Sequence, residues 1–332
     1  MAYRNLSRLL VALVAFVAAF GSVGVHAQSR LDFAVFHPER NFWSVTLKWW
    51  MGEVEKATQG RVKIVPHYAG SLVSLNNTMK SVSDGAIPMG VVAMSAISGQ
   101  MPAVGYIEAI GGMPDNPDAF VKSQVQLRPV LDAQFRKQGV EYLWSQGSGP
   151  LIVACRDKHL LTHDDWKGRK IRTAGRWQVE QIRALGASPV AMDPGEMYIA
   201  LQNRTLDCAL ANNVLAFGLK LHEVAPKITV LRAPVNLTAY IIHSAAFAKF
   251  SAQDRATTIR LGEEAERRSA TYLVQASDEA AKRMTAQRAD IRTLSDKDFV
   301  AFRSSIRKAF AKMDAESGPA GKQIADVLRQ YW

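Results

Sequence analysis

The sequence predicts an α/β protein with two lobes and a binding cleft between them. Segments typical of strands alternate with segments typical of helices, which favours mostly parallel sheets covered by helices on both faces. The chain has 332 residues, enough for two hydrophobic cores. It contains no low-complexity linker, so we expect crossing strands to connect the lobes.

The N-terminus has the three parts of a signal peptide. Arg4 and Arg8 form a basic start, Leu9 to Phe20 is an apolar run, and Ala27 supplies a small residue before a cut. A membrane-spanning helix needs roughly 20 apolar residues, so this run is too short. We therefore expect residues 1–27 to be a signal peptide cleaved after Ala27, with an uncleaved anchor as the alternative.

The formal charge of the chain is +11. Residues 1–27 contain Arg4 and Arg8 but no acidic residue, so their removal leaves +9. The basic residues are scattered rather than grouped with aromatic residues, so we expect no nucleic-acid partner. A basic surface is either simply solvated or attracts anionic ligands.

Cys155 and Cys208 are the only cysteines. Export would place them where disulfides persist, but the sequence does not say whether they come within bonding range. Because both lie in apolar, strand-like segments, we favour two buried free thiols over a disulfide. No spacing of cysteine and histidine indicates a metal site, and no cofactor is expected.

The first half of the chain reads as alternating strands and helices. Gly60 and Gly139 are natural helix ends, and Pro117 suits a first helical position. We expect strands over 31–36, 61–65, 89–94 and 140–144, and helices over 41–59 and 75–83 and from 116 to 139.

The second half repeats this pattern. We expect strands over 151–156, 170–173, 188–192, 206–211, 228–231 and 237–243, and helices over 177–185 and 195–203. After Ser251 the chain reads as almost wholly helical, with helix starts at Ser251 and Ser295, each followed three residues later by an aspartate.

Two segments are candidates for the crossings between lobes. Gly147 to Pro150 marks the first, and Pro234 to Asn236 marks the return. A ligand would then bind between the lobes, at the carboxyl ends of the strands.

Catalytic motifs are absent from the sequence. It has no GxSxG, HExxH, P-loop or GxGxxG pattern. An enzyme is therefore unsupported, and we expect a binding protein.

Arg172 is the strongest candidate for binding an acid. An arginine fork matches a carboxylate and stays charged. In Lys170-Ile171-Arg172 the alternation puts Ile171 on the opposite face, and the strand ends near Thr173, so Arg172 lies near the edge that would face a cleft. The alternative is one more charge in a basic run.

A series of motifs resembles the solute receptors of tripartite ATP-independent periplasmic (TRAP) transporters, the dicarboxylate-binding receptor family. The motifs are GRVKI, Gly-Ser-Leu and DGAIPMG in the first half, then KGRKIRT, LGASPV, GEMYIALQ and LDCALANN. The resemblance implies a two-lobed periplasmic binding protein fold with a long bracing C-terminal helix. It implies lobe 1 over 28–149 and about 236–285, and lobe 2 over 150–235 and about 286–332.

The resemblance also implies a function. It makes Arg172 the carboxylate ligand, a small organic acid the solute, and the permease subunits of a TRAP transporter the membrane partner. The protein would act in the periplasm. A receptor for another transporter or a sensor is the alternative, followed by a periplasmic α/β enzyme.

This sequence departs from the family pattern in two places. Many members carry a second arginine where this chain has Ile152, and Arg156 need not face the cleft. The family's acidic-Asn-Pro step is replaced by a segment with Leu210, where Asn212 or Asn213 supplies an amide. We therefore expect a less polar cleft and a monocarboxylate, aromatic or otherwise apolar, rather than a diacid.

Further cleft candidates follow from their positions beside strand ends, helix starts and crossings. Each has an alternative role in the core, above all Trp43 and Met94. The candidates are Phe36, Asn41, Trp43, Met94, Ser95, Ser148, Trp177 and Asn236.

Overall fold

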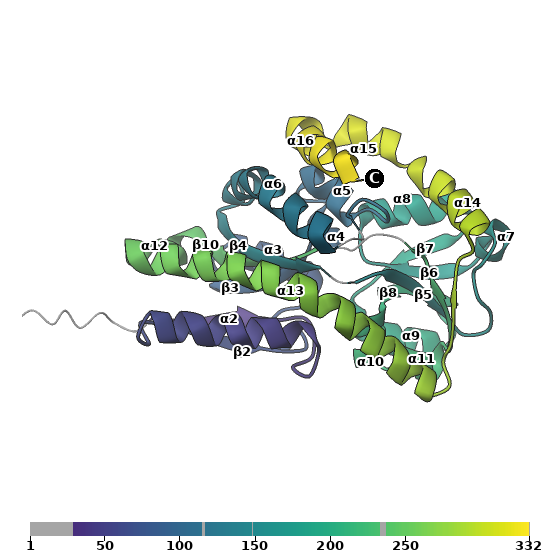
Figure 1. Cartoon of the computed structure of the whole chain (residues 1–332), viewed down its shortest axis with the longest axis horizontal. Helices are drawn as coiled ribbons and strands as arrows, with labels where there is room; N and C mark the ends of the chain where they lie inside the picture. The colour runs from purple at the N-terminus through teal and green to yellow at the C-terminus, as the bar shows by residue number, and fades with distance from the viewer. Residues whose placement is uncertain (1–28, 115–116, 148, 233–236, 332) are drawn as a thin grey trace, which may run out of the picture.

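A computed structural model of the chain describes residues 29–114, 117–147, 149–232 and 237–331. It contains two sheets, each packed with helices, that lie side by side along the long axis (Figure 1). The expected two-lobed α/β architecture is therefore confirmed. The expected signal peptide and the candidates Ser148 and Asn236 lie outside the described residues.

The first sheet has five strands: β1 (Ser29–Ala34), β2 (Val62–His67), β3 (Met89–Ala93), β4 (Val140–Gly147) and β10 (Leu237–His243). Their order is β2-β1-β3-β10-β4. β1 pairs in parallel with β2 and β3, whereas β10 pairs antiparallel with β3 and β4. All strands except β10 thus run in the same direction.

The second sheet has six strands: β5 (Leu151–Cys155), β6 (Lys170–Thr173), β7 (Ser188–Ala191), β8 (Cys208–Asn212), β9 (Lys227–Val230) and β11 (Asp290–Thr293). Their order is β11-β9-β5-β8-β6-β7. Only β5 runs against the others, pairing antiparallel with β8 and β9. β11 was not expected, because its four residues, DIRT, are too few and too polar to stand out in a helical region.

The reversed strands are those that follow each crossing. β4 of the first sheet leads into β5 of the second, and β9 of the second leads into β10 of the first. At each crossing the chain leaves one sheet at the edge that faces the other sheet. It then enters the second sheet at the edge that faces the first. The new strand must therefore run against its neighbours, which is why the mostly parallel sheets are mixed at these two positions.

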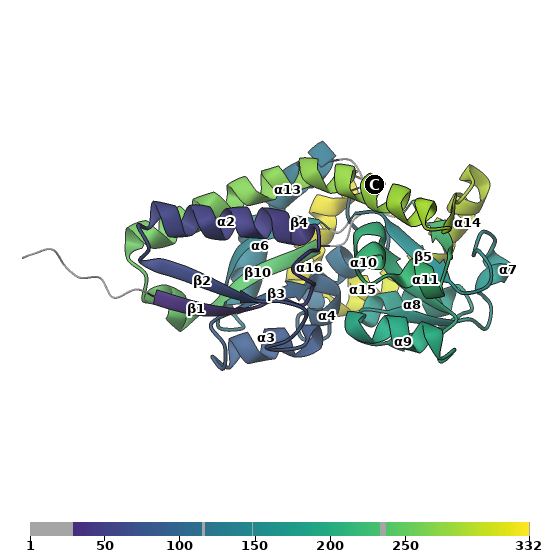
Figure 2. The ribbon, with the colours of Figure 1, turned by 90° about the horizontal axis from the view of Figure 1, so that it is seen from below.

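Helices cover both faces of the first sheet. They are α2 (Trp43–Ala57), α3 (Leu75–Ser83), α4 (Met94–Ile97), η1 (Pro102–Val104), α5 (Gly105–Glu108), α6 (Pro117–Arg136) and α12 (Ser244–Ala248). In α2, Trp43, Leu47, Trp50 and Val54 recur at helical spacing and are buried. α2 packs into a different core from α3 and α6, and Figure 2 shows α2 and α3 on opposite sides of the sheet.

The second sheet is covered in the same way. Its helices are α7 (His163–Trp166), α8 (Arg176–Ala184), η2 (Pro194–Glu196), α9 (Met197–Gln202), α10 (Asn213–Gly218), α11 (Leu221–Val224) and α14 (Asp296–Arg307). One core contains residues of α8 and α14, and the other contains residues of α9, α10 and α11.

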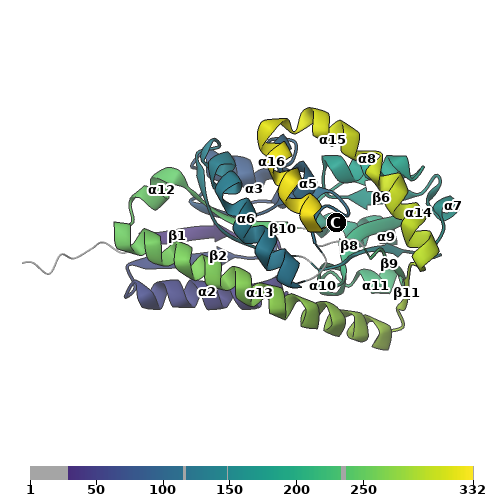
Figure 3. The same cartoon turned by 45° about the horizontal axis from the view of Figure 1, so that its top comes forward.

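Helix α13 (Ala252–Ala286) is the expected long brace (Figure 3). It packs on α2 and β4 in the first half, and on α10 and β11 in the second. Its start is the expected one, since the Ser251 hydroxyl accepts a hydrogen bond from the Asp254 amide at 3.0 Å. The Ser295 hydroxyl does the same for Asp298 at the start of α14.

The C-terminal elements are α15 (Phe310–Glu316), α16 (Gly318–Leu328) and η3 (Arg329–Tyr331). α14 packs on α7 and α8, whereas α16 packs on η1, α5 and α6 of the first half. The lobe boundaries stay a prediction, and these contacts favour assigning the segment from α16 onward to the first lobe.

The preference for free thiols was wrong, because Cys155 and Cys208 form a disulfide. The two residues lie directly opposite each other on the antiparallel strands β5 and β8, with Cα atoms 4.1 Å apart. Both side chains are fully buried. The sequence did not reveal this register, because residues 53 positions apart become neighbours only when the two strands pair.

Among the residues that the structure describes, no helix is both long enough and apolar enough to cross a membrane. α13 is long enough in residues, but it carries charged groups along most of its length.

Removing the disulfide should destabilise the protein. We expect the double substitution Cys155→Ala and Cys208→Ala to lower the free energy of unfolding by about 2–4 kcal/mol, because the cross-link limits the unfolded chain. Urea unfolding followed by circular dichroism measures this change. Reduced wild-type protein is the control and should unfold like the double variant; equal stability of oxidised wild type and variant would contradict the expectation.

Candidate functional site

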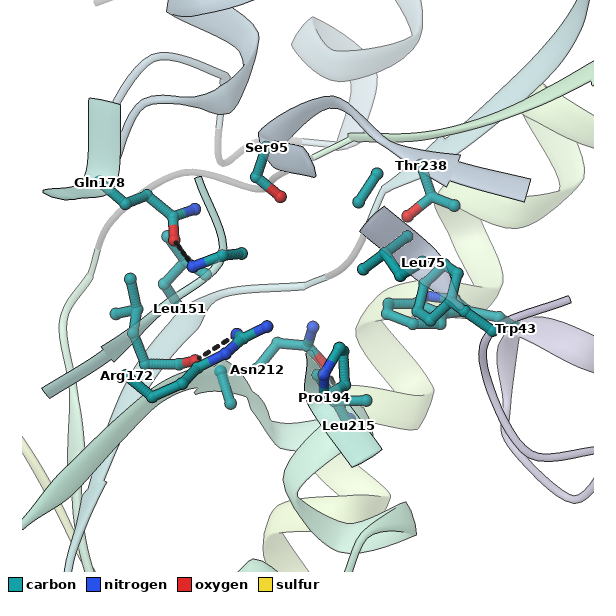
Figure 4. A pocket seen from close by; sticks show the side chains of 15 residues that line it. Trp43, Leu75, Ser95, Leu151, Arg172, Gln178, Pro194, Asn212, Leu215 and Thr238 are labelled. Carbon is teal, nitrogen blue, oxygen red and sulfur yellow. Dashed lines mark hydrogen bonds between the residues drawn. The ribbon is translucent and has the colours of Figure 1, made fainter. Parts of the chain in front are cut away.

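A cleft lies where the two sheets face each other (Figure 4). β3, β6 and β8 end there, and the reversed strands β5 and β10 begin there, so Leu151 is paired with Asn212 and Thr238 with Ala93. The lining residues are Phe36, Trp43, Leu75, Ala93, Ser95, Leu151, Arg172, Ala174, Gln178, Pro194, Leu210, Ala211, Asn212, Leu215 and Thr238.

Arg172 is held rigidly in the wall of this cleft. It lies on β6, where Ile171 faces the opposite way into the second-lobe core. The Arg172 side chain is almost fully buried. Its Nε donates to the Met192 carbonyl at 3.0 Å, and its Nη1 donates to the Leu210 carbonyl at 3.1 Å. These two bonds leave the outer N–H groups for an acceptor in the cleft.

The cleft wall carries a single charge. Among the described residues that line it, Arg172 is the only one with an ionisable side chain. Burial lowers the pKa of Arg172 to about 10, and the nearby Asp193 carboxylate opposes this shift. The guanidinium therefore stays protonated at neutral pH, in surroundings with little water to screen it.

Four neutral polar side chains face the same space. Asn212 Oδ1 accepts from the Leu215 amide at 2.8 Å and caps α10, so its Nδ2 remains for the cleft. Gln178 Oε1 accepts from the Ala174 amide at 3.0 Å. The Ser95 and Thr238 hydroxyl groups also lie at the cleft (Figure 4). Together they offer hydrogen bonds without adding charge.

The remaining walls are apolar. Phe36 and Trp43 meet edge to face, with ring centroids 5.7 Å apart, and Trp43 Nε1 is satisfied by the Gly147 carbonyl at 3.1 Å. Leu75, Leu151, Pro194, Leu210 and Leu215 complete the surface. The cavity measures about 50 Å³, room for a few water molecules at about 10–15 Å³ each.

Five predicted residues line the cleft and four described ones do not. Phe36, Trp43, Ser95, Arg172 and Asn212 are in the wall. Met94 and Trp177 are instead fully buried in the first-lobe core. Asn41 Oδ1 accepts from the Trp43 amide, and Asn213 Nδ2 donates to Ser277 Oγ. Whether the residues in the wall contact a ligand stays a prediction.

Sequence reasoning missed several lining residues. Gln178 follows the candidate Trp177 by one position, and a helical wheel of α8 would have separated the two faces. Leu151 is the first residue of β5, and Thr238 is the second residue of β10. Their role depends on that reversal, which the sequence did not reveal.

Ile152 was expected at the position where many family members carry a second arginine, but its neighbour Leu151 is the residue of β5 that faces the cleft. Leu151 lines the cleft, whereas Ile152 packs in the core on the other face of β5. Arg156 lies beyond the far end of β5, where it pairs with Asp207 at 3.3 Å. No additional cation comes from this strand. Within the described residues, no cluster of side chains is suited to hold a metal ion.

A family model described as bacterial extracellular solute-binding protein, family 7 (DctP), matches residues 33–317. A solute-binding protein of Albidiferax ferrireducens is 28% identical over 187 residues, covering 54% of this chain and 53% of that protein. The chain thus spans about half the length of this relative.

Two solved structures illustrate the likeness in fold. A TRAP periplasmic solute binding protein from Desulfovibrio salexigens, with bound orotic acid, superposes with a TM-score of 0.86 at 18% identity, covering 92% of this chain and 98% of that one. A Bordetella pertussis extracytoplasmic solute receptor binding pyroglutamic acid, DctP7, gives 0.85 at 18% identity, covering 90% and 99%.

Proposed function

Because the chain belongs to family 7 of the bacterial extracellular solute-binding proteins, we propose that it binds a compact monocarboxylic acid and delivers it to a TRAP-type permease. Members of this family are receptors rather than enzymes. The proposal concerns the solute, the residues that hold it and the membrane partner.

The buried guanidinium of Arg172 is the observation that carries the proposal. Two carbonyl groups fix the inner edge of this side chain, so its outer N–H groups point in a set direction before a ligand arrives. A carboxylate can accept two parallel hydrogen bonds from such a fork. Because the fork is preorganised, little side-chain freedom is lost on binding.

The charge of the wall limits the ligand to one carboxylate. A second carboxylate would face neutral side chains and apolar walls, with no other cation among the described lining residues. Moving an unpaired carboxylate out of water into such surroundings is unfavourable. This supports a monocarboxylate over a diacid, and the amide and hydroxyl groups of Asn212, Gln178, Ser95 and Thr238 favour further neutral polar atoms on the ligand.

The aromatic wall favours a ring-shaped acid. Phe36 and Trp43 both line the cavity, and their rings meet edge to face. Orotic acid and pyroglutamic acid, the ligands of the two similar receptors, each combine one carboxyl group with a ring amide. We take these acids as the first candidates for this cleft.

Capture outside the cytoplasm requires export and a membrane partner. The family is extracellular, and we infer that residues 1–27 direct export to the periplasm and are then removed. The loaded receptor would present its acid to the permease subunits of a TRAP transporter. Binding would favour the closed arrangement by the extra contacts that this arrangement makes with the ligand.

Replacing Arg172 should weaken acid binding. We expect Arg172→Ala to cost at least about 1.5–3 kcal/mol of binding free energy, the scale of a hydrogen bond to a charged group. Arg172→Lys should also lose affinity, since an ammonium cannot keep both carbonyl contacts and the fork. Isothermal titration with pyroglutamate and orotate measures both effects.

Arg169→Ala is the matched control, because Arg169 pairs with Asp157 outside the cleft. Equal affinities of wild type and Arg172→Ala would refute the role of Arg172 as the carboxylate ligand.

The charge argument predicts selectivity among acids. In a thermal-shift series, at least one of pyroglutamate, orotate and benzoate should raise the unfolding temperature, and succinate should raise it less. A ligand at about 100 times its dissociation constant adds roughly 2.7 kcal/mol of stability. A clear preference for succinate over all three monocarboxylates would sink the proposal of a singly charged ligand.

Export should shorten the chain at a defined bond. When the full chain is expressed with a functional secretion pathway, the periplasmic protein should begin at Gln28, as measured by intact mass or N-terminal sequencing. The substitution Ala27→Leu should hinder processing, because the cleavage site needs a small residue. Recovery of the full-length chain from the membrane fraction would instead support an uncleaved anchor.

A further inference from the structure

A buried carboxyl group joins the two lobes beside the ligand cleft. Glu108 is the last residue of α5 in the first half and is fully buried. Both of its carboxyl oxygens accept from the Trp177 amide at 3.0 Å, and Oε1 also accepts from the Gln178 amide at 3.0 Å. These amides belong to the first turn of α8, a helix of the second half.

Helix α8 has no cap of its own. Its N-cap residue is Gly175, which offers no side-chain acceptor. The first amides of a helix need an acceptor when they are buried, and a carboxyl oxygen can serve as one whether the group is neutral or ionised. Glu108 thus performs, from the other lobe, the task that a local serine or aspartate performs in most helices.

Further contacts join the segment 108–110 of the first half to helix α8, and we call this contact region the junction. Gln181 of α8 makes two bonds to Ile110, accepting from its amide at 2.8 Å and donating to its carbonyl at 2.9 Å. Trp177 is buried in the first-lobe core, and Ile110 is buried in the second-lobe core. Each lobe therefore contributes a side chain to the core of the other.

The backbone at the junction leaves no room for a side chain at Gly175. A Cβ atom there would lie 1.9 Å from the Ser95 carbonyl oxygen and 2.6 Å from Glu108 Oε1. The backbone of Ser95 therefore contacts the junction at Gly175, while Ser95 also lines the cleft.

The capped turn also carries part of the cleft wall. Gln178 lines the cleft and accepts from the Ala174 amide, and Ala174 is two residues after Arg172. Fixing the amides of Trp177 and Gln178 therefore fixes the segment that follows the proposed carboxylate ligand.

From this geometry we propose that Glu108 is a positioning residue for ligand binding, which shapes the Arg172–Gln178 segment from the opposite lobe. The proposal rests on the proposed function, since it concerns the same cleft. It adds a residue that does not itself line the cleft but sets the geometry of residues that do.

The ionisation of Glu108 gives the role a measurable signature. Burial raises the pKa of Glu108 to about 8, while the backbone amides of α8, the Ser98 hydroxyl and the charge of Arg176 act in the opposite direction. Arg176 itself pairs with Glu316 of α15 and stacks on Trp177. Because the pKa of Glu108 is raised from 4.5 to about 8, the assembled junction is favoured by the protonated form, and it weakens as the pH rises from the lower of these values to the higher one.

Two variants and one control test the proposal. Glu108→Ala leaves two buried amides without an acceptor, whereas Glu108→Gln keeps one acceptor oxygen and cannot ionise. Glu180→Ala is the control, because Glu180 is an acidic residue of the capped helix α8 and pairs with Arg183 and Lys312 rather than with the first-turn amides. Hydrogen exchange by mass spectrometry on ligand-free protein reports the peptide covering 173–181, with 188–202 as the internal reference.

We expect Glu108→Ala to speed exchange in 173–181 but not in 188–202, and to weaken binding of pyroglutamate or orotate by on the order of tenfold, as expected for loss of a helix cap. Glu108→Gln should restore both at pH 7. Between about pH 5 and 8 the wild-type affinity should fall, while that of Glu108→Gln stays level. Glu180→Ala should match wild type throughout.

Three results would overturn the proposal: unchanged exchange in Glu108→Ala, faster exchange with unchanged affinity, or the same pH profile in wild type and Glu108→Gln. If the wild type binds none of the tested acids, that outcome counts against the proposed function. The exchange comparison then decides the Glu108 proposal by itself, because unchanged exchange in 173–181 rejects it.

Discussion

The reversal of β5 and β10 is the constraint on which the cleft depends. Each of these strands enters its sheet from the edge that faces the other sheet. Leu151, the first residue of β5, and Thr238, the second residue of β10, therefore lie beside the last residues of the parallel strands β8 and β3. Without the reversal, the ends that carry Arg172 and Asn212 would have no partner wall from the crossing strands.

A buried cation inside this cleft shapes its chemistry. The desolvation of Arg172 is offset by two carbonyl groups and by the nearby Asp193, so the protein keeps a charge where water is scarce. Electrostatic attraction to an anion is strong under these conditions. The side chains around it are neutral and apolar, which is the basis of the proposal that this cleft takes one carboxylate rather than a diacid.

The two lobes are joined by more than their crossing strands. Helix α13 packs on both, and the exchange of Trp177 and Ile110 between cores ties α8 to the first lobe. The Glu108 carboxyl group accepts hydrogen bonds from the Trp177 and Gln178 amides at this contact between the lobes. A change in the relative position of the lobes would therefore act on the turn next to Arg172, which links the shape of the binding wall to the packing behind it.

Local patterns were sufficient for most elements and for locating one charged residue of the cleft wall. Apolar spacing located α2, α3 and α13, and strand alternation together with the family motifs singled out Arg172. Aromatic and polar residues after strand ends, such as Phe36 and Ser95, were also found, because parallel strands end at a common edge. Met94, Trp177, Asn41 and Asn213 were expected at the cleft by similar reasoning and are not among its lining residues, since position next to a strand end does not say which face a side chain takes.

Sequence by itself thus determined the fold class, the family and the presence of Arg172 at the cleft, because these depend on periodicity and on motifs that are contiguous in the chain. Tertiary structure alone decided the Cys155–Cys208 disulfide, the strand β11, the wall residues Leu151 and Thr238, and the capping of α8 by Glu108. Each of these depends on the register or the docking of segments far apart in sequence, and such pairings are set by the whole packed chain rather than by local propensity.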